Sequence, residues 1–190
     1  VRPTQGKIMV NNEEIEAGSM DQLKEKFSYV PQKIYFLEGS LLDNINFGLS
    51  EEKVNMKKSE DTTRQSLVKT LISNLSIDLQ TNISDETEMV SGGQKQLIGI
   101  GRALNRGGEI LILDESTSAM DYDLERKVLD AIFNSSFKTV IAVTHKQSLL
   151  KNFDKIALFN KGKIIDFGSF DYLNANNKIF QETLKNYDKF

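Results

Sequence analysis

Two short apolar runs, Ile110–Leu113 and Val140–Val143, most constrain how this chain can fold. Neither run alternates apolar with polar residues, so each is typical of a strand that is covered on both faces. A helical pattern over residues 91–105 precedes the first run, and another over 122–133 separates the two runs. Helices that alternate with such strands predict an α/β fold, with a largely parallel sheet and helices on both faces.

The rest of the chain extends this pattern. Residues 6–10 and 26–32 are predicted strands, 40–79 and 170–187 are predicted helical regions, and 155–168 are a predicted hairpin. The predicted apolar helix faces are Leu67, Leu71, Ile72 and Leu75, then Leu97, Ile100, Ala103 and Leu104, then Leu124, Val128, Leu129 and Ile132.

Composition excludes several classes of function. The 190 residues hold no cysteine, which excludes disulfides, a thiolate nucleophile and a Cys-based metal site. A net charge of −3 gives no field that would attract nucleic acid. No apolar run approaches the roughly 20 residues that a membrane-spanning helix needs.

Two adjacent acids, Asp114 and Glu115, follow the first apolar run. In a parallel sheet the carboxyl ends of the strands open into the ligand crevice, where acids are costly unless they meet a cation or move a proton. An Asp in this position can hold Mg²⁺ in ATPases, and the next acid can orient or deprotonate a water. Alone, the pair is equally typical of an ordinary solvated strand end.

The segment Ser91–Gln94, "SGGQ", stands at the start of the 91–105 helix. Its glycines allow backbone N–H groups to approach an anion, and the helix N-terminus favours negative charge. Ser91 adds a hydroxyl and Gln94 an amide donor. Alone, the segment is better explained as a helix capped by Ser91.

Two further polar residues follow predicted strands. His145 is the only histidine and comes after the second apolar run, and Gln32 follows "YVP". An imidazole there could contact a terminal phosphate, and an amide could complete the shell of an ion. Each residue alone would more often have no such role.

Together these pieces resemble the nucleotide-binding domain of ATP-binding cassette transporters over nearly the whole chain. "YVPQ" is similar to the Q-loop, "VSGGQ" to the signature motif, "ILILDE" to Walker B, "STSAMD" to the D-loop and "AVTH" to the H-loop. The order and spacing of the five motifs match as well. "PQKIYFLEGSLLDNINFG" and the C-terminal tail resemble the exporter and flippase type.

The resemblance implies a P-loop NTPase-type fold, ATP and Mg²⁺ as cofactors, and a role for each motif residue. Gln32 and, through water, Asp114 would coordinate Mg²⁺, Glu115 would be the general base, and His145 would contact the γ-phosphate. Signature residues act on the nucleotide of a second, head-to-tail domain, and Asp121 would couple the two sites. The implied signature residues are Ser91, Gly92, Gly93 and Gln94.

The resemblance also implies domains, partners and a location. Residues 1–34 and 98–190 would form a partial RecA-like core, and 35–97 a helical subdomain that ends in the signature. The partners would be a second nucleotide-binding domain and a transmembrane domain, which would hold the chain at the cytoplasmic face of a membrane. No nucleic-acid partner is implied.

The phosphate-binding pattern G-x-x-x-x-G-K-[ST] occurs nowhere in the sequence. "RPTQGKI" resembles the stretch after the Walker A helix, so the chain is expected to be a fragment that binds ATP poorly and hydrolyses essentially none alone. Two alternatives stay open. One is a truncated, non-catalytic module that caps a partner's ATP in trans, and the other is a soluble cassette ATPase not linked to transport.

Overall fold

The structure is a computed structural model that describes residues 5–7, 9–10, 13–14, 20–49, 73, 75, 77–85 and 90–187. It divides the chain into two compact units, Val1–Val143 and Thr144–Phe190. Among the described residues, no helix has the length and apolar character needed to cross a membrane.

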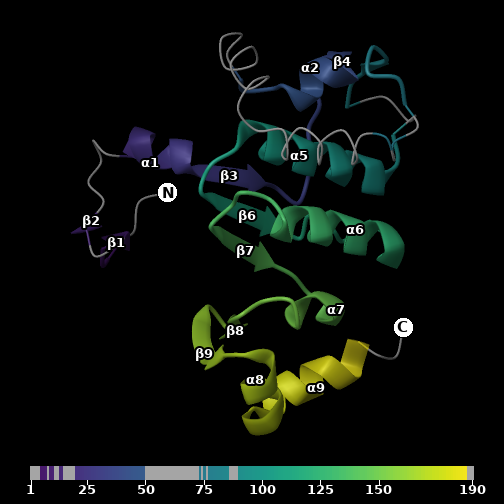
Figure 1. Ribbon diagram of the computed structural model, residues 1–190. Helices are drawn as coiled ribbons and strands as arrows, with labels where there is room; N and C mark the ends of the chain where they lie inside the picture. Colours follow the sequence, from purple (N-terminus) through teal and green to yellow (C-terminus); the bar gives the residue numbers. More distant parts are fainter. Residues whose placement is uncertain are drawn as a thin grey trace. The chain divides into compact units, whose positions relative to one another are not determined.

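A three-stranded parallel sheet organises the first unit (Figure 1). It consists of β3 (Phe27–Val30), β6 (Ile110–Asp114) and β7 (Thr139–Val143), with β6 in the centre. Because all three strands run in the same direction, their carboxyl ends meet at one edge of the sheet. The predicted α/β fold with a parallel sheet is therefore confirmed.

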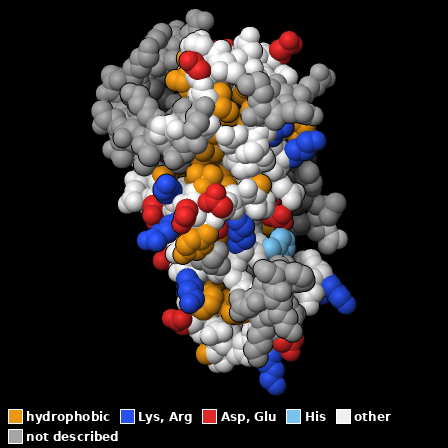
Figure 2. Space-filling view, turned by 90° about the vertical axis from the view of Figure 1, so that its right-hand side faces the viewer, with side chains coloured by type: hydrophobic (Ala, Val, Ile, Leu, Met, Phe, Trp, Pro, Cys, Tyr) orange, Lys and Arg blue, Asp and Glu red, His pale blue; other side chains and the backbone are white. Residues whose placement is uncertain are grey.

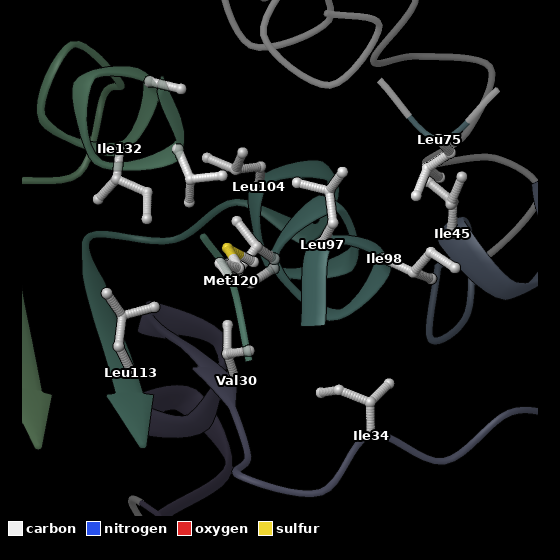
Figure 3. Close-up of a cluster of buried hydrophobic side chains, with 14 of the residues drawn as sticks. Val30, Ile34, Ile45, Leu75, Leu97, Ile98, Leu104, Leu113, Met120 and Ile132 are labelled. Atoms are coloured by element: carbon white, nitrogen blue, oxygen red, sulfur yellow. The ribbon is translucent and has the colours of Figure 1, made fainter. Parts of the chain in front are cut away.

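Two helices pack on this sheet through the predicted apolar faces. They are α5 (Gly92–Arg106) and α6 (Tyr122–Phe133). In Figure 3, Val30 and Leu113 extend from the sheet toward the side of Leu97 and Leu104 of α5, and Ile132 comes from α6. The residues of these two predicted faces are all buried except Leu124, which is partly buried against the core.

The opposite side of the sheet differs from the prediction for residues 140–143. Side chains alternate along β7, and Ile141 and Val143 are about half exposed, at 49% and 51%. Tyr29 lies on the same face, because it pairs in register with Ile112 and through it with Ile141, and it is 54% exposed. The prediction that the β7 run is buried on both faces is thus wrong, since α5 and α6 cover one face only.

Shorter elements complete the first unit. They are β1 (Met9–Val10), β2 (Glu13–Glu14), α1 (Met20–Lys26), β4 (Gly39–Ser40), α2 (Leu41–Ile45) and β5 (Asn82–Ile83). Helix α2 begins at a capping box formed by Ser40 and Asp43. Hydrogen bonds that Ser40 donates to the Asp43 carboxylate hold the pKa of Asp43 below its usual value.

The helix predicted over 40–79 is described only in part. Much of this sequence, including Leu67, Leu71 and Ile72, lies outside the described residues. The described residues 77–83 form turns and a strand instead of a helix.

The second unit contains the predicted hairpin and the predicted C-terminal helical region. Strands β8 (Ile156–Asn160) and β9 (Lys163–Gly168) pair antiparallel through a two-residue turn in which Lys161 and Gly162 both have positive φ. A short helix, α7 (Gln147–Leu150), precedes them. The C-terminal region is two helices, α8 (Phe170–Asn176) and α9 (Lys178–Tyr187), because Asn177 leaves the helical conformation and accepts the Phe180 N–H.

Arg102 connects three segments of the first unit. Its guanidinium donates to the backbone oxygens of Asn44 and Tyr35 and to Oδ1 of Asn44, each at 2.6 Å. It also lies over the rings of Phe36 and Phe47. Burial lowers the pKa of Arg102, against the opposing charge of Asp85, but the group stays protonated. Three hydrogen bonds from one rigid guanidinium thus fasten α5 to α2 and to the chain that follows β3.

Gly99 and Gly101 of α5 are expected to respond differently to alanine. A Cβ at Gly101 meets no atom within 4 Å, so Gly101→Ala should raise the free energy of unfolding by about 1 kcal/mol through helix propensity. A Cβ at Gly99 would lie 2.4 Å from Cδ1 of Ile34, so this gain should be lost there. Urea unfolding measures both variants. In an Ile34→Ala background, which lacks both Cδ1 and the Cγ1 that lies 2.9 Å from the added Cβ, Gly99→Ala should recover the gain. Equal effects of the two single changes would contradict the assignment.

Candidate functional site

The predicted acids lie at the carboxyl end of the central strand. Asp114 ends β6, and Glu115 turns the chain away from the sheet with φ 47°, a left-handed conformation that non-glycine residues rarely adopt. The Glu115 N–H donates to the backbone oxygen of Val143 at 2.9 Å, which fastens this turn to the end of β7. Backbone strain of this kind is common where a side chain must be aimed at a ligand.

Gln32 meets Glu115 where β3 and β6 run side by side. Its Nε2 donates to Oε2 of Glu115 at 2.7 Å. Val30 and Leu113 are register partners, so the two side chains leave the sheet at the same level. Because the nitrogen of Gln32 is engaged, a cation or water would be coordinated by its amide oxygen.

Tyr29 is a site neighbour that sequence reasoning missed. Its hydroxyl donates to Oδ2 of Asp114 at 2.9 Å. This hydrogen bond, with burial and the carboxylate charge, raises the pKa of Tyr29 above its usual value. The alternation of side chains along paired parallel strands could have revealed it, because Tyr29 and Asp114 fall on the same sheet face.

The signature-like segment forms the N-terminus of α5. Ser91 is the N-cap, and its Oγ accepts the Gln94 N–H while Oε1 of Gln94 accepts the Ser91 N–H. Nε2 of Gln94 donates to the backbone oxygen of Leu75 at 3.1 Å. The predicted donor of Gln94 is therefore engaged within the chain, and the capped-helix interpretation describes this turn as the structure has it.

The loop that follows Glu115 packs against the same turn. A Cβ at Gly93 would lie 2.9 Å from the backbone oxygen of Ala119, so no larger residue fits there without displacing the loop. Gly92 and Ala119 also line a cavity of about 280 Å³ that Gln32 borders. Asp121 ends the loop and caps α6, since its Oδ1 accepts the Leu124 N–H at 2.8 Å.

His145 belongs to the second unit, which begins at Thr144. It is exposed and stands two positions after Val143, the register partner of Asp114. The structure thus unites Gln32, Asp114 and Glu115 within the first unit, and places the signature turn and Asp121 on the loop and helices that adjoin them.

These donors suit a hard cation. Asp114, Glu115 and the amide oxygen of Gln32 supply oxygen atoms, which Mg²⁺ prefers. Within the described part of the chain, no three His, Cys, Asp or Glu side chains gather as a metal cluster. Two carboxylates and one amide oxygen fit Mg²⁺, which a protein usually holds by one or two carboxylates while water and substrate phosphates fill the other positions.

Comparison with known proteins decides the family. Residues 1–118 match the family model described as ABC transporter. The chain belongs to the ABC transporter family. Members of this family bind ATP, generally with magnesium.

The curated relatives are exporter-type proteins. Over 182 residues the chain is 30% identical to an ATP-dependent lipid A-core flippase of Cupriavidus pinatubonensis, covering 94% of the chain and 30% of that protein. It is 31% identical to the lactococcin-A transport/processing ATP-binding protein of Lactococcus lactis, covering 97% of the chain and 26% of that protein. The chain thus spans less than a third of the length of these relatives.

A solved structure confirms the fold. A bacterial Atm1-family ABC exporter with ATP bound superposes with a TM-score of 0.83 at 23% identity, over 100% of this chain and 33% of that one. At this identity the likeness establishes the architecture and not the activity.

Two buried serines at opposite ends of the sheet, Ser116 at the site and Ser28 at the far edge, should respond oppositely to alanine. Oγ of Ser116 is buried without a hydrogen-bond partner in the described structure, so Ser116→Ala should leave the free energy of unfolding unchanged or raise it by about 1 kcal/mol. Ser28 donates to the backbone oxygen of Gly107, and Ser28→Ala should lower the free energy of unfolding by about 1–3 kcal/mol. Thermal unfolding compares the two, and a larger loss for Ser116→Ala would contradict this assignment.

Proposed function

We propose that this chain is part of the ATP-hydrolysing motor of an ABC exporter. The observation that carries the proposal is the hydrogen bond between Gln32 and Glu115 beside Asp114, at the carboxyl edge of a parallel sheet. In a chain of the ABC transporter family this edge is where a nucleotide and its cation would be handled. The substrate carried by the complete transporter is left open.

The residues divide the chemistry between them. Bound Mg²⁺ would neutralise charge on the phosphates during phosphoryl transfer. Asp114, acting through water, and the amide oxygen of Gln32 would hold that ion. Glu115 would take a proton from the attacking water as general base, and the Gln32 amide keeps its carboxylate oriented.

The remaining predicted site residues would act on phosphates or between two domains. His145 would contact the terminal phosphate of the same nucleotide. Ser91, Gly92 and Gly93 would present the N-terminus of α5 to a nucleotide held by a second copy or a related domain, and that end of a helix favours an anion. Gln94, whose side chain is engaged in the cap, would orient this turn. Asp121 would link the two nucleotide sites.

A groove on the first unit supports a transmembrane partner. It has a volume of about 620 Å³ and lies among β3, α5 and the chain after β3. Tyr35 and Phe47 border it and are 60% and 54% exposed. Among the described residues that line it, the charged ones are Lys24, Arg102 and Arg106. An apolar, positively lined groove suits a short helix from a transmembrane domain that carries apolar and acidic side chains.

The division of the chain and its location follow from this proposal. Residues 1–34 and 98–190 would belong to the ATPase core and 35–97 to the helical subdomain, with the groove near their junction. The motor would lie at the cytoplasmic face of a membrane. On the face drawn in Figure 2, basic and acidic side chains are interspersed among the described residues, which supports a role without nucleic acid.

Glu115→Gln should abolish most ATP hydrolysis by the complete transporter polypeptide. Loss of a general base lowers the turnover rate by about 10²–10⁴-fold. Steady-state phosphate release with Mg-ATP measures it. Glu109→Gln is the matched control, because Glu109 precedes the same strand at its far end and pairs with Lys138 at the surface. Equal activity of the two variants would contradict the role of Glu115, and ATP binding without any hydrolysis in the unmodified protein would favour the capping alternative.

Phe47→Ser should weaken coupling to the transmembrane domain. The side chain is exposed at the groove, so its loss removes apolar contact area with a partner, a cost of about 1–2 kcal/mol of binding. We expect substrate stimulation of ATP hydrolysis to fall while basal hydrolysis stays. Phe133→Ser is the control, since Phe133 is an exposed phenylalanine at the end of α6 that does not border the groove. An equal effect of both changes would remove the groove from the proposal.

A further inference from the structure

We propose that Gln96 is a positioning residue that makes the signature turn and the loop after Glu115 move as one body. The inference rests on the proposed function for its catalytic consequence, but the mechanical link itself stands on contacts within this chain. Through Gln96, the position of the N-terminus of α5 would determine the position of the Glu115 backbone.

Gln96 uses both ends of its amide on the loop. Oε1 accepts the backbone N–H of Ala119 at 2.9 Å, and Nε2 donates to Oγ of Ser118 at 2.9 Å. Nε2 also lies 3.4 Å from the backbone oxygen of Glu115 as a longer hydrogen bond. One side chain of α5 therefore holds the loop at three residues, and the first of them is Glu115, the candidate general base.

Burial makes these hydrogen bonds consequential. Gln96 is 6% exposed, and the neighbouring Met120 is also 6% exposed. A polar side chain this deep is costly unless its donors and acceptor are satisfied, and here the loop satisfies them. An apolar residue would fill the same space more simply, so packing alone does not account for an amide at this position.

The glycine pair of the signature forms the second half of the link. Gly93 contacts the loop so closely that a Cβ would lie 2.9 Å from the Ala119 oxygen, and a Cβ at Gly92 would lie 3.4 Å from the Ala119 side chain. The Ala119 N–H is thus held by Gln96, while the Ala119 carbonyl oxygen lies against Gly93. Displacing the start of α5 must displace Ala119, because close-packed groups transmit such shifts.

Glu115 is the group that this link would control. Its left-handed backbone conformation has to be held by its surroundings, and three hydrogen bonds act there. The Glu115 N–H donates to Val143, and the Glu115 oxygen accepts from the Ser118 N–H and from Gln96. When a nucleotide engages the signature turn of this chain, the shift would pass through Gln96 to the carboxylate that faces this chain's own nucleotide. The link thus supplies a physical route between two sites that the family places on different nucleotides.

Amide hydrogen exchange of the purified chain tests the link without any nucleotide. Gln96→Met keeps the side-chain length and removes both hydrogen-bonding ends, so exchange at Ser118–Met120 should quicken about tenfold while that of β6 is unchanged. Gln96→Glu keeps an oxygen that can accept the Ala119 N–H, so the Ala119 amide should retain most of its protection from exchange. Gly101→Ala is the control on the same helix, because its Cβ meets no atom within 4 Å.

Two outcomes of the exchange experiment overturn the proposal. One is unchanged exchange at Ser118–Met120 in Gln96→Met, and the other is equal acceleration across β6 and the loop, which would mean a general loss of stability. Gly93→Ala provides a second variant with the same expectation by steric displacement. Acceleration in both variants, confined to the loop, supports the link.

Kinetics of the complete transporter tests the consequence. In Gln96→Met, kcat for ATP should fall about tenfold with KM within about twofold, because the base is misplaced while ground-state nucleotide contacts remain. Gln96→Glu should recover part of kcat. A changed loop with unchanged kcat would overturn the catalytic part alone, whereas no hydrolysis in the unmodified transporter would overturn the proposed function and leave the link standing.

Discussion

Burial of α5 on two sides is the constraint on which the rest of the first unit depends. One side of the helix packs on the sheet through residues such as Leu97 and Leu104, and another meets α2 and the chain after β3 near Ile98 and Ile45 (Figure 3). A helix enclosed in this way cannot rotate or slide without opening the core. Every segment that carries a candidate site residue of this unit is attached either to this helix or to the sheet under it.

The two attachments differ in kind, and both are needed. Apolar contacts enclose α5, but because they have no direction they do not specify which polar groups of the neighbouring loops the helix meets. Arg102 and Gln96 supply the direction, since one fastens the chain after β3 and the other fastens the loop after β6. Gln32 and Glu115 stand on those same two segments, and the pairing of β3 with β6 brings their side chains together.

The sequence predicts the parts of this arrangement that depend on local pattern. The β6 and β7 runs, the apolar faces of α5 and α6 and the hairpin around Gly162 follow from periodicity and turn chemistry. The hydrogen bond between Gln32 and Glu115 depends on β3 lying beside β6, which no local pattern specifies. The long-range polar contacts are not written in any local pattern. No local pattern distinguishes Gly99, which lies against Ile34, from Gly101, which has open space beside it. Tyr29 is placed beside Asp114 by the pairing of β3 with β6 and not by its own sequence neighbours.

The loop after Glu115 combines features that work against stability with one that restores it. Glu115 has a left-handed backbone, and Ser116 buries a hydroxyl group with no partner in the described structure. Both are costly, and they lie side by side at the start of the loop. Two backbone hydrogen bonds within the loop, from Ser118 to Glu115 and from Met120 to Thr117, hold it from inside. Gln96 adds hydrogen bonds from a helix that is itself enclosed. The loop is strained in itself but held by α5. It therefore keeps its conformation while α5 is in place and can change conformation when α5 shifts.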